Sequence, residues 1–145
     1  MKWTKEAGIE IKGFFMLALP TETLEESRQT IEFSKALGID WAQFTLTVPF
    51  PGRPMFDLAK TTGRFLDKKW ESYQTWAGWA GIEPVYVPEN RETAEIQNLQ
   101  KTALREFFLR PTVLFRHMLT VIRHPVLIHK YAQGAAALLA TLCDV

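Results

Sequence analysis

The residues best placed to do chemistry stand where an apolar run meets the start of a helix. Residues 14–19 carry no polar side chain, which predicts a strand buried on both faces, as in a parallel sheet. Pro20 lacks an amide donor and ends that strand. Thr23 and Glu26 have the spacing of a capping box, which starts a helix. Free amides and the positive helix end then face one crevice, so ligand binding is the chemistry expected here.

A second turn of unusual composition follows the next predicted strand, residues 41–48. It reads Pro49-Phe50-Pro51-Gly52-Arg53-Pro54. Three prolines and a glycine fix a rigid turn, remove amide donors and let the backbone come close to something flat. Turns of this composition also serve as plain chain reversals, so both readings stay open from the sequence.

The cysteine and histidine residues do not indicate a metal site or a disulfide. Cys143 is the single cysteine, which excludes an internal disulfide and a cluster or zinc site built from cysteines of this chain alone. His117, His124 and His129 are seven and five residues apart, so no two of them share a helix face at the i, i+4 spacing of a metal pair. We interpret them as structural or surface histidines.

The composition and the net charge limit which classes of partner are expected for this chain. The 145 residues are 47% hydrophobic and 12% aromatic, which is enough for one domain with a core. A net charge of +1 gives no electrostatic reason to expect nucleic acid as a partner. Four arginines recur in the C-terminal part of the chain: Arg105, Arg110, Arg116 and Arg123. They could form a basic face that binds a phosphate or an anionic lipid, or they could be the solvated side of an amphipathic helix.

Targeting signals are not evident, and a cytoplasmic location is the expectation. The first nine residues contain Lys2, Lys5 and Glu6 and lack the apolar core of a signal peptide. Residues 126–145 are apolar but are interrupted by His129, Lys130 and Gln133, which leaves too short a run for a spanning helix.

The elements needed to position these residues form an α/β pattern. The first part of the chain is predicted to contain a helix end at 3–8 closed by Gly8, a strand at 14–19, a helix at 23–37 and a strand at 41–48. A short helix at 55–62 and an aromatic-rich irregular stretch at 65–90 follow. The last part is predicted to be helical at 91–109, where Asn90 is the cap, from Pro111 to Arg123, and after Pro125. Two strands joined by a helix of this length make a right-handed βαβ unit.

The second strand has two different faces. Phe44, Leu46 and Val48 lie on one face, and Gln43, Thr45 and Thr47 lie on the other. In a barrel the first set would pack under helices and the polar set would face a lumen that holds a ligand. A barrel filled by side chains and an edge strand with one wet face fit the same alternation.

Several segments, taken in order, resemble the late-barrel region of radical S-adenosylmethionine enzymes. They are Ala7-Gly8-Ile9, residues 15–23 and Pro49-Phe50-Pro51-Gly52. Trp70 followed by Tyr73, and residues 104–111, resemble the cobalamin-binding branch related to anaerobic magnesium-protoporphyrin IX monomethyl ester cyclase and hopanoid-modifying enzymes. The family pattern Gly-Leu-Pro-Gly-Glu-Thr reads Ala18-Leu19-Pro20-Thr21-Glu22-Thr23 here, so both glycines are replaced. Thr21 must therefore keep a negative φ or be strained.

This resemblance implies a site and cofactors. The residues that would line an S-adenosylmethionine pocket are Leu17, Ala18, Leu19, Glu22, Pro49, Phe50, Pro51 and Gly52. For Glu22 a capping and helix-dipole role is an equal alternative. The family holds its [4Fe-4S] cluster on a Cys-x-x-x-Cys-x-x-Cys loop and its cobalamin on a separate domain, and neither is in this sequence. S-adenosylmethionine, the iron–sulfur cluster and cobalamin are thus expected in the intact enzyme, and none is expected to be held by this chain alone.

The resemblance also implies an organisation for the chain. We expect a partial (β/α) barrel fragment followed by an α-helical C-terminal tail, with late barrel elements at 1–64, an aromatic-rich cover at 65–90 and the tail at 91–145. On this reading the chain is the C-terminal part of the enzyme, forming pocket wall and substrate cover but not competent alone.

Two other readings remain open. One is a non-catalytic remnant or adaptor whose helical tail binds a partner chain or a membrane surface. The other is a small βα binding domain unrelated to the superfamily. The expected partners are the remainder of the enzyme, or a second copy through open sheet edges, with peripheral membrane contact and no nucleic acid.

Overall fold

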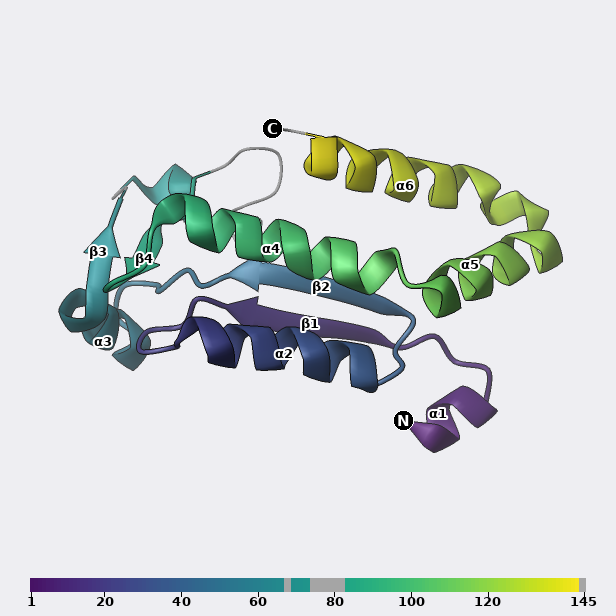
Figure 1. Cartoon of the computed structure of the whole chain (residues 1–145), viewed down its shortest axis with the longest axis horizontal. Coiled ribbons are helices and arrows are strands. Elements are labelled where there is room, and N and C mark those ends of the chain that lie inside the picture. The colour runs from purple at the N-terminus through teal and green to yellow at the C-terminus, as the bar shows by residue number, and fades with distance from the viewer. Residues whose placement is uncertain (67–68, 74–82, 144–145) are drawn as a thin grey trace.

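Two parallel strands and the helix between them form the centre of the molecule. The computed structural model describes residues 1–66, 69–73 and 83–143. Strand β1 (Lys12–Leu17) pairs with β2 (Trp41–Leu46) in parallel, with Phe15 opposite Phe44. Helix α2 (Leu24–Ala36) connects them (Figure 1). The predicted α/β class and its βαβ unit are confirmed, and no closed barrel forms within the described ranges.

Helix α2 starts as the capping box predicts. The Thr23 hydroxyl oxygen accepts a hydrogen bond from the Glu26 amide at 3.2 Å, and the Glu26 carboxylate accepts one from the Thr23 amide at 2.8 Å. The Thr23 amide and the Thr23 hydroxyl both donate to the Glu26 carboxylate, and these bonds hold its pKa below the ordinary value because they favour the charged form. Ser27, Ile31 and Ser34, which recur at helical spacing, form the buried side of the helix.

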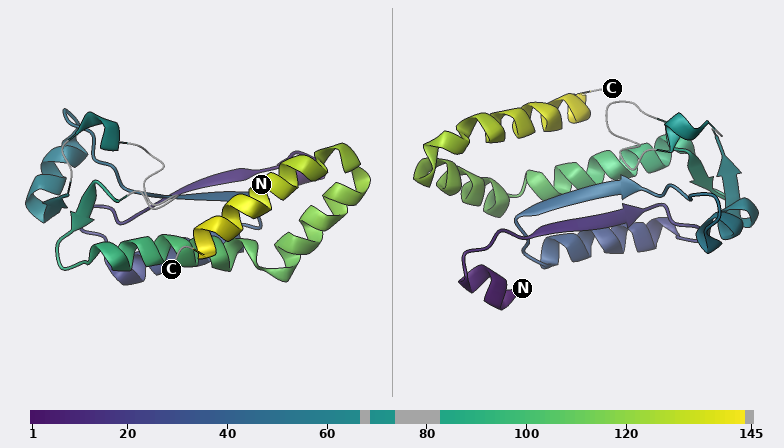
Figure 2. Two further views of the ribbon diagram at one scale, coloured as in Figure 1. Left: turned by 90° about the horizontal axis from the view of Figure 1, so that it is seen from above. Right: turned by 180° about the vertical axis from the view of Figure 1, so that it is seen from behind.

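The β1/β2 sheet is covered on one face. Helices α2 and α4 (Thr93–Phe108) lie on the same side of it (Figure 2). The Phe44 ring packs on Phe107 with ring centroids 6.2 Å apart. On the other face Phe14 is 70% exposed and Met16 is 44% exposed. The prediction of a first strand buried on both faces was therefore wrong, because the helices cover one side only.

The outer edge of β2 is partly closed by a side chain from α4. The Thr47 amide points toward β1, where it bonds the Leu17 carbonyl at 2.9 Å. Backbone groups alternate in direction along a strand, so the Phe44 carbonyl points away from β1. The buried Gln100 side-chain amide donates to that carbonyl at 2.9 Å. The edge is thus satisfied at this position without another strand.

A small second sheet lies beyond the first. Helix α3 (Pro54–Thr62) leads into β3 (Gly63–Phe65), which pairs antiparallel with β4 (Tyr86–Pro88). A Cβ at Gly63 would come within 2.3 Å of the Val87 carbonyl oxygen, so only glycine permits this approach.

The predicted cover at 65–90 is therefore not irregular throughout. Its described residues also include a 3₁₀ turn, Trp70–Ser72. Trp76 and Trp79, counted in the aromatic cover, lie outside the described residues. Val48 joins Val85 and Tyr73 in a separate small cluster and not the main core beneath α2 and α4.

Helices α1 (Lys2–Glu6) and α5 (Pro111–Arg123) both lie at the end of the sheet where β1 and β2 begin (Figure 1). Helix α1 ends before Gly8, whose φ of 73° fits the predicted glycine stop. Helix α5 follows α4 and is itself followed by a 3₁₀ turn (Pro125–Leu127) and α6 (Ile128–Cys143). No helix of the described chain is long and apolar enough to cross a membrane.

The cap predicted for α4 was misplaced. Glu92 is the N-cap residue, and Asn90 instead takes a left-handed conformation with φ of 61°. Asparagine tolerates this conformation, so Asn90 serves the turn that precedes the helix.

Candidate functional site

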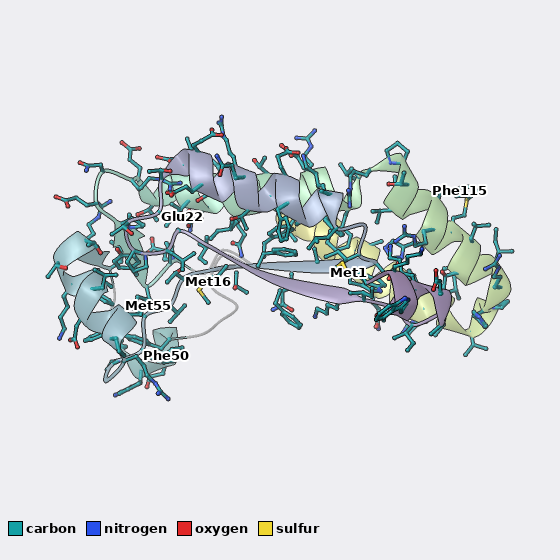
Figure 3. All side chains as sticks on the ribbon, turned by 90° about the horizontal axis from the view of Figure 1, so that it is seen from below. Met1, Met16, Glu22, Phe50, Met55 and Phe115 are labelled. Atoms are coloured by element: carbon teal, nitrogen blue, oxygen red, sulfur yellow. The ribbon has the colours of Figure 1, made fainter. Side chains whose placement is uncertain are left out.

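The two turns predicted to bind a ligand lie side by side at the carboxyl ends of β1 and β2. The Thr47 amide and hydroxyl both donate to the Leu17 carbonyl, at 2.9 and 3.0 Å. This bond holds the end of one strand against the end of the other. In Figure 3 Glu22, from the first turn, and Phe50, from the second, lie at the same end of the molecule.

The first turn is strained in the way its lost glycines indicated. Ala18 has a φ of 60° and Thr21 a φ of 71°, both in the left-handed region that favours glycine. Of the two conformations left open for Thr21, the strained one is observed. Leu17 is 0% and Ala18 1% exposed, so these two residues form the buried floor of the turn, while Leu19 is half-buried and partly open to solvent.

Glu22 has a structural role in this turn. One of its carboxylate oxygens accepts a hydrogen bond from the Leu19 amide at 2.7 Å, and its own amide donates to the Leu19 carbonyl at 3.0 Å. Of the two roles predicted for Glu22, the structure shows a capping role. Glu22 caps the turn, however, and Glu26 completes the cap of helix α2. The second carboxylate oxygen has no hydrogen bond to the described residues.

The second turn presents an aromatic surface. Pro49 is buried, whereas Phe50 is 41% exposed and Pro51 and Gly52 lie in solvent. Gly52 has a φ of 81°, and a Cβ placed on it would meet no atom within 4 Å. The turn therefore leaves open space beside Phe50.

Tyr73 extends that surface. Its ring lies 5.9 Å from Phe50 and 5.6 Å from Trp70, centroid to centroid. The three rings form a continuous apolar strip next to the strand ends. The sequence reasoning named Trp70 and Tyr73 as part of the aromatic cover and of the family resemblance, but it did not place them at the site.

The polar face of β2 does not behave as a ligand-binding lumen. The Thr47 hydroxyl binds the Leu17 carbonyl, and the Thr45 hydroxyl lies 3.4 Å from the Phe15 carbonyl. These hydroxyls satisfy the neighbouring strand. Gln43 is buried at 8% exposure.

A buried arginine at the start of α4 was not foreseen. Arg91 is 7% exposed, and its Nε lies 2.5 Å from a carboxylate oxygen of Glu95. Within the part of the chain that the structure describes, its guanidinium nitrogens make no well-directed hydrogen bond. Buried guanidinium groups are normally paired on several sides, so Arg91 retains unused donors. The start of α4 lies at the same end as the carboxyl ends of β1 and β2 (Figure 1).

A groove of about 420 Å³ lies between α2 and α4 and runs from Leu24 and Glu95 to Glu32 and Glu106. Glu32 and Glu106, two of its acids, already pair with Lys35, at 2.5 and 2.7 Å. Glu95, a third acid, pairs with Arg91. Within the described residues no group of three histidine, cysteine or acidic side chains is arranged to hold a metal ion.

The predicted basic face is divided by the fold. Arg116 turns inward to Asp40 at 2.6 Å, and Arg110 donates to the Lys35 carbonyl at 2.7 Å. Burial lowers the pKa of Arg110, and the nearby Arg116 lowers it further. Arg105 and Arg123 remain exposed on different helices. These arginines therefore do not form one anion site.

Comparison with known proteins finds methyltransferases. The chain is 33% identical over 134 residues to a protein described as uncharacterized methyltransferase PH0819, from Pyrococcus horikoshii. This match covers 92% of the chain and 28% of that relative, so the chain spans about a quarter of the relative's length. It is also 31% identical over 68 residues to bacteriochlorophyllide d C-12(1)-methyltransferase from Chlorobaculum tepidum, which covers 47% of the chain and 14% of that protein.

Two further comparisons returned nothing. No family model matches the chain. No solved structure matches it.

These findings correct the family and function expected from the sequence. We expected a piece of a radical S-adenosylmethionine enzyme of the cobalamin-binding branch, with a [4Fe-4S] cluster. The relatives are methyltransferases by name, and no radical S-adenosylmethionine family model matches. The expectation rested on short proline- and glycine-containing turns, which mark the ends of strands in many α/β proteins. The adaptor reading gains no support from the comparisons either.

Proposed function

We propose that the chain is part of an S-adenosylmethionine-dependent methyltransferase and forms one wall of its cofactor pocket. The similarity to a methyltransferase over 92% of the chain supports this proposal. The observation that carries it is the junction of two parallel strand ends, where the first turn meets an exposed aromatic turn. Ligands of α/β proteins bind in such crevices.

The finer organisation is part of the same proposal. The β1-α2-β2 unit would be a segment of a larger parallel sheet, because two strands alone leave edges and a face uncovered. Residues 1–64 would carry the pocket wall, 65–90 its cover and 91–145 the helical tail. A methyltransferase of this kind acts on a second substrate, which other parts of a longer protein would help to select.

The residues at the strand ends fit the cofactor's chemistry. Leu19 and Phe50 offer an apolar surface for the adenine ring, and Gly52 leaves room beside it. The second carboxylate oxygen of Glu22 can accept a hydrogen bond from a hydroxyl or ammonium group. Arg91 holds unused donors of the kind that bind a carboxylate.

When bound, S-adenosylmethionine supplies a methyl group activated by a positively charged sulfur. The residues of this chain would hold it and exclude water. The Phe50 and Tyr73 rings would shield one side of the pocket. The first turn, fixed by the bond between Glu22 and the Leu19 amide, would present the Leu19 side chain and the second Glu22 carboxylate oxygen to the ligand.

The test is a titration of the ¹⁵N-labelled chain with S-adenosylmethionine, followed by two-dimensional NMR. We expect shifts in the amides of Leu17, Ala18, Leu19, Glu22, Phe50 and Gly52. Phe50→Ala should weaken binding roughly tenfold through loss of the aromatic wall. Phe33→Ala, which removes an exposed ring from α2, is the matched control and should bind as the wild type does.

Adenosine serves as a second probe because it lacks the carboxylate. Phe50→Ala should weaken binding of both ligands, whereas Arg91→Gln should weaken S-adenosylmethionine alone. A titration that moves none of the strand-end amides, or moves only amides elsewhere, contradicts the proposal. Equal loss of both ligands in Arg91→Gln contradicts the carboxylate role of Arg91.

A further inference from the structure

Helix α5 turns its apolar side chains toward solvent. Four of them recur at helical spacing and form what we name the α5 stripe: Leu114, Phe115, Met118 and Ile122. Each is half or more exposed, with Phe115 at 57% and Ile122 at 66%. Phe115 projects from α5 away from the body of the molecule (Figure 3). A helix of a folded domain normally buries such a stripe.

The opposite side of α5 is the one that packs. Val113 is buried in the main core, and Arg116 reaches Asp40 at 2.6 Å. His117 lies 4.4 Å from the Trp41 ring, centroid to centroid. Since these contacts fix the orientation of the helix, the α5 stripe cannot turn inward without breaking them.

The chain segment that carries the α5 stripe has charged side chains of one sign, and the carboxylates of Asp40 and Glu10 face its packed side at Arg116 and His117. Residues 107–143 contain no aspartate or glutamate, but they contain Arg110, Arg116, Arg123 and Lys130. Asp40 neutralises Arg116, while Arg123 is exposed in the last turn of α5. The apolar surface continues past the helix to Val126, which is also exposed. An apolar stripe within a segment of net positive charge is complementary to a surface that is both apolar and anionic.

We propose that the α5 stripe docks the molecule on an anionic lipid surface. Helix α5 would lie in the interface with Phe115 and Ile122 among the acyl chains and Arg123 at the headgroups. The stripe is at the opposite end of the molecule from Glu22 and Phe50 (Figure 3), so docking leaves the candidate site open. The proposal does not rest on the proposed function.

The test is co-sedimentation of the chain with vesicles. Vesicles of phosphatidylcholine with phosphatidylglycerol should retain the protein, and pure phosphatidylcholine vesicles should retain it at least tenfold less. Raising the salt concentration should weaken binding to the anionic vesicles. The double variant Phe115→Ser/Ile122→Ser should bind them roughly a hundredfold less, because each lost side chain contributes about tenfold.

A matched control separates the α5 stripe from general stickiness. Phe33→Ser removes an exposed ring of similar exposure from α2 and should bind vesicles as the wild type does. All variants should keep the wild-type circular dichroism spectrum, because every substituted side chain is exposed.

Three outcomes would overturn the proposal. The first is no retention by anionic vesicles, and the second is unchanged retention of Phe115→Ser/Ile122→Ser. The third is a wild-type dimer, seen in sedimentation without lipid, that the double variant abolishes, because the α5 stripe would then bind a second copy.

Discussion

Thr21 holds a backbone conformation that a β-branched residue rarely adopts. Its φ of 71° lies in the left-handed region, and so does the φ of 60° at Ala18, three residues earlier. Two strained residues in one turn are a feature of binding loops, where the surrounding structure imposes the conformation. Here the Glu22 carboxylate and the Leu19 amide provide that restraint at 2.7 Å.

Replacing Thr21 by glycine should stabilise the protein. The left-handed conformation costs an L residue about 1–2 kcal/mol, and glycine avoids this cost. Glycine also loses more conformational entropy on folding, which offsets part of the gain. Thr21→Gly should therefore raise the free energy of unfolding by about 0.5–1 kcal/mol. Urea unfolding followed by circular dichroism measures this. Thr102→Gly, at an exposed position within α4, is the control and should lower the same quantity by about 0.5 kcal/mol. Destabilisation by Thr21→Gly would show that the turn is not strained at this residue.

At the scale of elements, the helical tail is held against the sheet by a half-buried aromatic cluster. His117 of α5 packs on Trp41 of β2 and on Tyr131 of α6, with centroids 4.4 and 5.3 Å away. Burial lowers the pKa of His117, while the carboxylates of Glu10 and Asp40 oppose this and Arg116 adds to it. Its Nε2 has no hydrogen-bond partner in the described chain. The packing therefore favours the neutral imidazole.

This arrangement predicts a loss of stability in weak acid. The folded pKa of His117 is lower than the unfolded value of about 6.5, so below that pH the unfolded chain binds the extra proton. Stability should therefore fall as the pH drops from 7 through 6.5 toward the folded pKa. The melting temperature of the wild type should fall as the pH drops across this range. It should fall with a smaller slope in His117→Phe, which keeps a ring at this position. His124→Gln changes an exposed histidine and should keep the wild-type slope; an equal slope in His117→Phe would exclude His117 as its source.

At the scale of the whole molecule, one face of the β1/β2 sheet has no covering helix. One face is covered by α2 and α4, and the other exposes Phe14 and Met16 (Figure 2). Gln100 closes the outer edge of β2 at Phe44. The face without helices still carries enough apolar side chains to favour a partner.

Self-association through this open face is the expected result for the chain in solution. Sedimentation velocity should show association that grows with concentration, and Phe14→Glu should weaken it roughly tenfold by placing a charge on the face. Phe33→Glu places the same charge on α2 and should leave association unchanged. A wild type that is monomeric at every concentration would contradict this prediction. Association through the α5 stripe would instead respond to Phe115→Ser/Ile122→Ser.

Local features were predictable because the residues that make them are neighbours. The capping box of Thr23 and Glu26 spans one helical turn, and its hydrogen bonds form as the spacing predicts. Pro111 and Gly8 likewise marked a helix start and a helix end. Residues 85–87 resemble a strand in the sequence and overlap β4, but β3 and its pairing with β4 were missed, because the two strands are short and separated by some twenty residues.

The candidate site was predictable in position and not in its details. The family resemblance implied one pocket for the two turns, and the parallel pairing of β1 with β2 does bring their carboxyl ends to one edge. Arg91 could not be recognised, since its burial depends on where α4 packs. The family expected from the same turns was wrong, because short turn motifs report backbone geometry and not chemistry.

The sequence by itself determined the α/β class, the βαβ unit and the junction at residues 14–23, because propensity, capping and periodicity act over a few residues. Tertiary structure alone decided which faces are covered. It placed α2 and α4 on one side of the sheet, left Phe14 exposed and turned the α5 stripe outward. An apolar side chain carries the same signal in a sequence whether it is buried or exposed, since burial depends on contacts between residues far apart in the chain.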